Sequence, residues 1–149
     1  NDAGGIYLNQ PNADGTPSAL VLQGGTITRN NAANTGGGIY SNKGALEMTG
    51  GTISKNTVTN YGAGMYLRTT TAKITGGVID ANVSGKDGGG LWVTVSTELT
   101  MTDCVFRNNH SDMKGGAIGC YGNIDMTDCY GVKTAGTYCN FHIIIPFGK

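Results

Sequence analysis

Short segments in which apolar and polar residues alternate recur along the chain, separated by glycine pairs and asparagine-rich turns. Alternation of this kind predicts β-strands with one buried face, whereas an amphipathic helix would repeat its apolar residues about every 3.6 positions. The segments are grouped in copies that open on a GGIY-like motif and begin at Ala3, Gly36, Gly62, Gly88 and Gly115. The intervals are 33, 26, 26 and 27 residues, and a nearly constant period in this range is typical of stacked repeats.

Each copy is expected to supply three short strands, and equivalent positions in successive copies form three apolar columns. The columns are Ile6, Ile39, Met65, Leu91 and Ile118; Leu22, Met48, Ile74, Met101 and Met126; and Ile27, Ile53, Ile79 and Phe106. One coil can bury only one layer of such residues, so the coils must stack at ~4.8 Å and share a core. The pattern therefore predicts one all-β domain over residues 1–149, a parallel β-helix with about five coils of ~26 residues. Residues 3–129 are expected to form regular coils, and residues 130–149 a degenerate coil and a C-terminal cap.

A polar column follows the third strand of each coil and consists of Asn30, Asn56, Asn82 and Asn109. Stacked asparagine side chains can donate and accept hydrogen bonds along the axis of a solenoid. We therefore expect these amides to satisfy one another at a buried turn.

Two motifs give the chain a resemblance to a known family. The GGAI motif at residues 115–118 and the FxxN motif at residues 106–109 resemble the repeat of the chlamydial polymorphic outer-membrane proteins. Glycine-rich GGTIxxN repeats also resemble those of bacterial and archaeal adhesin-like surface proteins, and together these likenesses extend over residues 3–129. The resemblance implies a right-handed parallel β-helix that is secreted or exposed at a cell surface, but a fold of this kind does not imply one ligand.

The charge balance and hydropathy of the chain argue against nucleic acid and membrane as partners. Ten basic residues balance ten acidic ones, and charged residues make up 13% of the chain, so no basic stripe for nucleic acid is expected. No apolar run approaches the ~18 residues of a membrane span, which argues against membrane insertion. The expected partners are therefore a glycan, a surface protein, or a second copy stacked end to end.

One aromatic column is a candidate ligand-binding surface. Tyr7, Tyr40, Tyr66 and Trp92 each follow an inward apolar residue, so alternation places them on the outer face. A row of rings ~4.8 Å apart would suit stacking on sugar rings or on a partner protein. The alternative is that the rings stack on one another and only stiffen the sheet.

The four cysteines fall into two equivalent pairs. Cys104 and Cys129 occupy the same place in two MTDC segments, and Cys120 and Cys139 share the column of Ser41. Residues one coil apart lie within the distance that a disulfide requires, so the sequence predicts Cys104–Cys129 and Cys120–Cys139 disulfides. The alternative is a ladder of buried free thiols.

Metal binding and catalysis have weaker support. Asp103 and Asp128 are expected to stack one coil apart, where their carboxylates could bind calcium. The alternative is that both are solvated turn residues. No other cofactor is expected. Neither His110 nor His142 lies in a constellation of catalytic residues that the spacing reveals, so the chain is expected not to be an enzyme.

The apolar C-terminal segment contains Phe141, Ile143, Ile144 and Ile145. It could fold over the end of the solenoid as a cap, or it could add to a neighbouring molecule as a strand. The sequence as a whole favours an extracellular, non-enzymatic surface or structural module of the adhesin type. A filament subunit that stacks end to end and a polysaccharide-active β-helix enzyme stay as alternatives.

Overall fold

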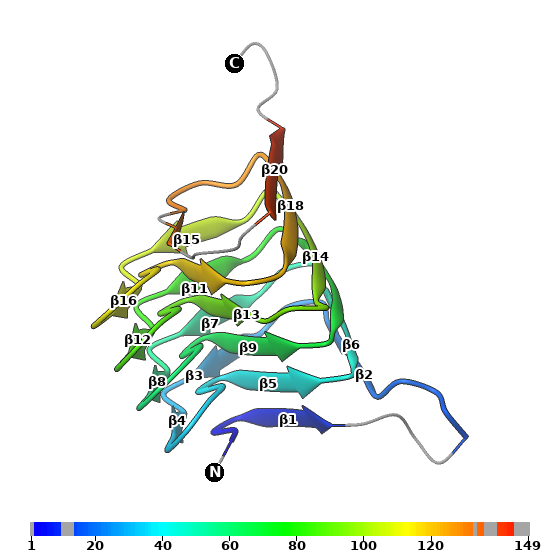
Figure 1. Ribbon diagram of the computed structural model, residues 1–149, viewed down its shortest axis with the longest axis horizontal. Coiled ribbons are helices and arrows are strands. Elements are labelled where there is room, and N and C mark those ends of the chain that lie inside the picture. Colours follow the sequence, from blue (N-terminus) through cyan, green and yellow to red (C-terminus); the bar gives the residue numbers. More distant parts are fainter. Residues whose placement is uncertain (1, 10–13, 133, 136–139, 145–149) are drawn as a thin grey trace.

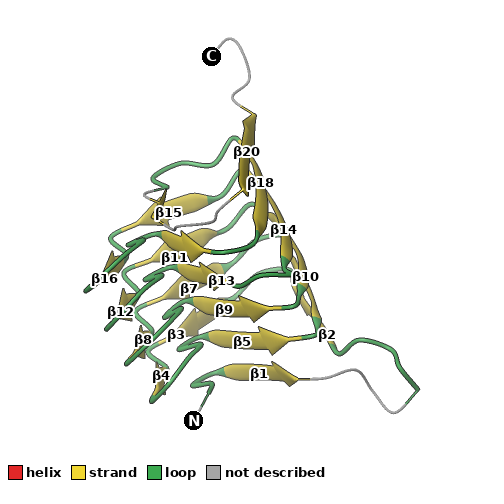
Figure 2. Cartoon of the chain, viewed as in Figure 1, coloured by secondary structure: helices red, strands yellow, loops and turns green. Residues whose placement is uncertain are grey.

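The computed structural model describes residues 2–9, 14–132, 134–135 and 140–144 and shows a parallel β-solenoid (Figures 1 and 2). Within these residues every strand pairing is parallel and no helix is present, as the alternating pattern predicts. No described segment is a helix of the length and apolarity needed to cross a membrane.

Strands that open successive coils form the first sheet: β1 (Ile6–Asn9), β5 (Ile39–Asn42), β9 (Met65–Arg68), β13 (Leu91–Val93), β17 (Ile118–Cys120) and β19 (Thr134–Ala135). The second sheet, at one edge of the solenoid in Figure 1, contains β2 (Ala19–Leu22), β6 (Ala45–Met48), β10 (Thr71–Thr75), β14 (Glu98–Thr102), β18 (Asn123–Thr127) and β20 (Asn140–Ile144).

The third sheet contains β3 (Thr26–Thr28), β7 (Thr52–Ser54), β11 (Val78–Asp80) and β15 (Val105–Arg107). The fourth, at the opposite edge in Figure 1, contains β4 (Asn31–Ala32), β8 (Thr57–Val58), β12 (Val83–Ser84) and β16 (His110–Ser111). Four coils therefore carry all four strands, and the described parts of the next two contribute to the first two sheets. The sequence predicts about five coils of three strands each; the fourth strand escapes it because two residues are too few to show alternation.

The predicted apolar columns are confirmed by the pairing register. Ile39 pairs with Met65, and Ile53 pairs with Ile79, each one coil apart. These side chains are fully buried and belong to one continuous core that runs the length of the stacked coils. The coils thus share one apolar interior, as expected of a solenoid whose single repeats cannot bury their own faces.

The asparagine column is confirmed as a buried ladder. The Nδ2 of Asn56 donates to Oδ1 of Asn82 at 3.0 Å and to the carbonyl oxygen of Ile27, in the preceding coil, at 3.1 Å. Asn82 repeats the pattern, since its Nδ2 donates to Oδ1 of Asn109 at 2.9 Å and to the carbonyl oxygen of Ile53 at 3.0 Å. Among the described residues, no buried side-chain nitrogen or oxygen lacks a hydrogen-bond partner. The buried asparagines therefore do not destabilise the fold through unpaired polar atoms.

The C-terminal segment continues the solenoid over residues 140–144. β20 pairs in register with β18, with Ile124 opposite Phe141, Met126 opposite Ile143 and Thr127 opposite Ile144. Residues 140–144 therefore form a further rung of the second sheet, as expected of a degenerate coil, and the C-terminal cap stays a prediction. Ile145 lies outside the described residues.

Candidate functional surface

The aromatic column lies on the outer face of the first sheet, in the predicted register. Tyr7 pairs with Tyr40, Tyr40 with Tyr66, and Tyr66 with Trp92. The rings of Tyr7 and Tyr40 stack at 4.9 Å between centroids with planes 12° apart, and those of Tyr40 and Tyr66 stack at 5.3 Å and 7°. The coil spacing thus brings the rings together face to face.

Trp92 takes part in a second group of rings that the sequence does not reveal. It stacks on Tyr61 at 5.1 Å, and Tyr121 meets it edge-on at 5.2 Å. Tyr61 comes from the turn before β9, and the ammonium group of Lys86 lies 5.4 Å from its ring centroid. Gly119, which follows Trp92 in the column, leaves the space for the indole, since a Cβ there would lie 2.6 Å from two of its ring carbons.

The column is therefore not the exposed stripe that alternation predicts. Tyr40 and Trp92 are each only 6% exposed, whereas Tyr7 is 51% exposed and Tyr121 is 38% exposed. Burial also raises the pKa of the Tyr40 and Tyr66 hydroxyl groups above that of a free phenol. Tyr40 stacks between two rings and Trp92 packs against two others, so the row mainly stabilises the sheet.

Tyr40→Ala is expected to lower the free energy of unfolding by about 3 kcal/mol, because a buried ring with ring neighbours on both faces is lost. Tyr7→Ala, which removes an exposed ring from the end of the same stack, is the matched control and should cost about 1 kcal/mol or less. Urea denaturation followed by far-UV circular dichroism measures both. Equal losses in the two variants would contradict the burial difference between the two rings.

Cys104 and Cys129 occupy equivalent places one coil apart but are free cysteines, so the predicted Cys104–Cys129 disulfide is absent. A separation of ~4.8 Å between equivalent Cα atoms of parallel coils lies within the range that a disulfide spans, so the register itself permits the bond. Cys120 is buried in the main core, and its predicted partner Cys139 lies outside the described residues, so the Cys120–Cys139 disulfide stays a prediction.

Asp103 and Asp128 are turn residues with φ of 54° and 52°, in the left-handed region that aspartate tolerates better than most residues. The amide of Asp103 donates to the carbonyl oxygen of Thr127 at 3.1 Å, which holds the two turns in register. Calcium requires six to eight oxygen ligands, and the described residues contain no group of three or more candidate metal-binding side chains. We therefore do not assign the two aspartates as metal ligands.

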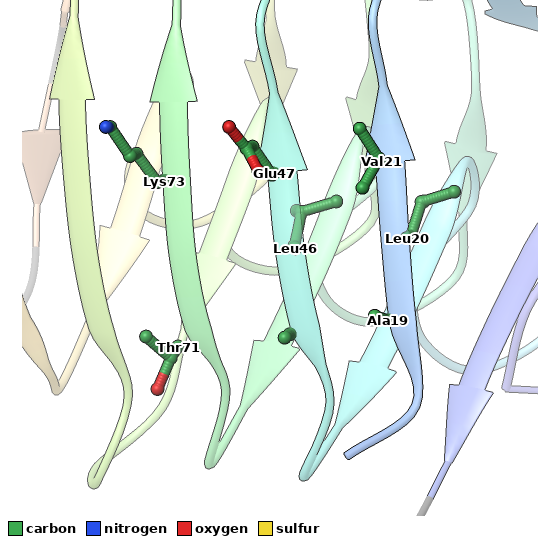
Figure 3. Close-up of a pocket in the computed structure, with 8 residues that line it drawn as sticks. Ala19, Leu20, Val21, Leu46, Glu47, Thr71 and Lys73 are labelled. Atoms are coloured by element: carbon green, nitrogen blue, oxygen red, sulfur yellow. The ribbon is translucent and has the colours of Figure 1, made fainter. Parts of the chain in front are cut away.

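A shallow hollow of about 350 Å³ lies on the outer face of β2, β6 and β10 (Figure 3). Its lining is mostly small or apolar, and its charged side chains, Glu47 and Lys73, point the same way from adjacent strands. Two His–Asp pairs lie elsewhere on the surface: His110 contacts Asp112 at 3.1 Å, and His142 contacts Asp125 at 3.8 Å, all with exposed side chains. These pairs do not line the hollow, so the described residues do not gather acid, base and nucleophile in one pocket.

Comparison with protein families gives one match. Residues 103–121 match the Chlamydia polymorphic membrane protein (Chlamydia_PMP) repeat, a stretch that contains β15, β16 and β17 and runs from the fourth coil into the fifth. This match, together with the parallel solenoid, confirms the resemblance indicated by the GGAI and FxxN motifs. The matched stretch is far less than half of the chain, so it shows a likeness of one repeat. Comparisons with curated proteins and with solved structures give no match.

Proposed function

We propose that this chain is a surface-exposed, non-enzymatic β-solenoid module of an adhesin-like protein. The observation that carries the proposal is the match to the Chlamydia polymorphic membrane protein repeat at residues 103–121. That repeat belongs to membrane proteins, and its likeness here supports association with an outer surface. End-to-end filament assembly and action on polysaccharides stay predictions of the sequence.

The chemistry of the surface is compatible with display outside a cell. Charges balance at ten of each sign, and the exposed apolar side chains include Tyr7, Val95, Met113 and Tyr130 on different parts of the solenoid. Such a stacked core keeps its backbone amides paired between coils and leaves the turns open to vary. The accessible rings Tyr7 and Tyr121, rather than the whole aromatic row, are the surface that we propose for contact with a glycan or a surface protein.

Surface exposure is tested on intact cells that produce the protein. We expect antibodies against the module to label unpermeabilised cells, and external protease to remove that label while an internal marker stays intact. Labelling that appears only after permeabilisation would contradict the proposal. Glycan-array binding that is lost in Tyr7→Ala but kept in Val21→Ala, an exposed apolar control on the second sheet, would identify the contacting ring.

A further inference from the structure

Two free cysteines face each other across the boundary between the fourth and fifth coils. Cys104 precedes β15 and Cys129 follows β18. The amide of Tyr130 donates to the carbonyl oxygen of Cys104 at 2.9 Å, and the amide of Phe106 donates to that of Tyr130 at 2.9 Å, so the two cysteines lie in register. A side-chain hydrogen bond between the two cysteines shifts the pKa of each thiol.

The surroundings of the two sulfur atoms differ. The Sγ of Cys104 is fully buried and lies 3.4 Å, 3.6 Å and 3.7 Å from the carbonyl oxygens of Thr102, Ile74 and Gly76. A thiolate beside three carbonyl oxygens would be repelled, so Cys104 keeps its proton. The Sγ of Cys129 is partly exposed and lies 3.5 Å from the carbonyl oxygen of Thr127.

Ionisation follows this difference. The hydrogen bond from Cys104 stabilises the Cys129 thiolate and lowers the pKa of Cys129 to about 7, against the opposing effects of burial and of the Asp103 carboxylate. The same hydrogen bond, together with burial, raises the pKa of Cys104. The pair therefore consists of an accessible thiolate and a buried thiol in contact, an arrangement typical of a reactive cysteine beside a resolving one.

We propose that Cys129 is a site of oxidation by hydroperoxides and that Cys104 resolves it into a disulfide between the two coils. The Cys129 thiolate attacks one peroxide oxygen, the O–O bond breaks, and an alcohol leaves after taking up a proton, so that Cys129 becomes a sulfenic acid. The sulfur of Cys104 then attacks the sulfur of Cys129, the S–O bond breaks, and the hydroxyl group leaves as water with the Cys104 proton. Two thiols are oxidised by two electrons, and one hydroperoxide is reduced to an alcohol and water.

The position of the pair gives the oxidised bond a structural consequence. β15 is the last strand of the third sheet among the described residues, and beyond it that sheet continues as a single bridge between Val105 and Tyr130. The disulfide would join the fourth and fifth coils beside this bridge.

The chain is treated with tert-butyl hydroperoxide under native conditions, its remaining thiols are alkylated, and it is digested on both sides of each cysteine. Lys114 separates Cys104 from Cys120, and cleavage before Asp125 or Asp128 separates Cys120 from Cys129. We expect mass spectrometry to find the Cys104 and Cys129 peptides linked, and dithiothreitol to release them. Alkylation of both thiols as in untreated protein, or oxidation of Cys129 without a link, would overturn the proposal.

Single variants separate the two roles. Alanine at position 104 keeps the Cβ and removes only the sulfur, so it fits the same space and cannot donate a hydrogen bond. In Cys104→Ala, Cys129 should stop at the sulfenic acid and be trapped by dimedone, whereas in Cys129→Ala, Cys104 should stay unmodified. Equal trapping in both variants would overturn the assignment of roles.

The pH profile adds a readout that a purely structural pair would not change. Iodoacetamide alkylation of Cys129 should reach half its maximal rate near pH 7 in the native chain, in line with the lowered pKa. In Cys104→Ala the midpoint should rise by about 1 pH unit or more, because the donor is lost while the Asp103 carboxylate remains. An unchanged midpoint would show that Cys104 does not activate Cys129.

Discussion

Asn82→Ala is expected to lower the free energy of unfolding by about 4 kcal/mol, because it leaves several buried polar groups without partners. The backbone N–H and the Nδ2 of Asn56 both donate to Oδ1 of Asn82, at 3.1 Å and 3.0 Å. The Nδ2 of Asn82 in turn donates to the carbonyl oxygen of Ile53 and to Oδ1 of Asn109. The site is fully buried, so water cannot easily replace the lost amide.

Asn60→Ala is the matched control for Asn82→Ala. Asn60 also bonds an asparagine one coil away, from its Nδ2 to Oδ1 of Asn34 at 2.7 Å, but this contact lies at the exposed turn. Its loss should cost about 0.5 kcal/mol or less, since water can take over both groups. Urea denaturation of both variants measures the difference, and a loss below about 1 kcal/mol in Asn82→Ala would show that the buried ladder does not stabilise the fold.

The coil register could be read from the sequence because one repeat length fixes many pairings at once. Once Ile53 is placed under Ile79, the 26-residue interval also places Asn56 under Asn82 and Tyr40 under Tyr66. Two-residue strands such as β4 and β8 carry no alternation of their own, so the fourth sheet was not predicted. The repeat length therefore predicts the register between coils, but it does not predict the conformation of each corner.

Burial on the outer face could not be read from the sequence. Alternation says which side of a strand Tyr40 and Trp92 occupy, but their low exposure depends on rings in neighbouring coils and, for Trp92, on Tyr61 from the turn before β9. The only local signal was that Tyr61 directly precedes the GAG segment that opens its coil. Likewise, register predicts that Cys104 and Cys129 meet, but it does not say whether the two thiols are oxidised, and both are free.

The glycine-rich corner before each first strand provides the second large effect, because a side chain added there would collide with the adjacent coil. A Cβ added at Gly90 would lie 2.5 Å from the carbonyl oxygen of Ala117 in the next coil and 3.1 Å from a methyl carbon of Ile79. That carbonyl oxygen accepts the amide of Leu91 at 2.8 Å, so it cannot move away without weakening the ladder. Gly90→Ala is therefore expected to lower the free energy of unfolding by about 3 kcal/mol.

Gly24→Ala is the control for Gly90→Ala, since it adds the same methyl group to a glycine in another corner of the solenoid. A Cβ at Gly24 meets nothing within 4 Å, and its φ is not in the left-handed region. The substitution also restricts the unfolded chain, so stability should stay within about 0.5 kcal/mol of the parent or rise slightly. Urea denaturation measures the stability of both variants. Hydrogen exchange of the Leu91 amide measures whether its hydrogen bond at this corner is weakened. Parent-like stability and slow exchange in Gly90→Ala would mean that the coils can separate there without cost, contrary to the close backbone contact between them.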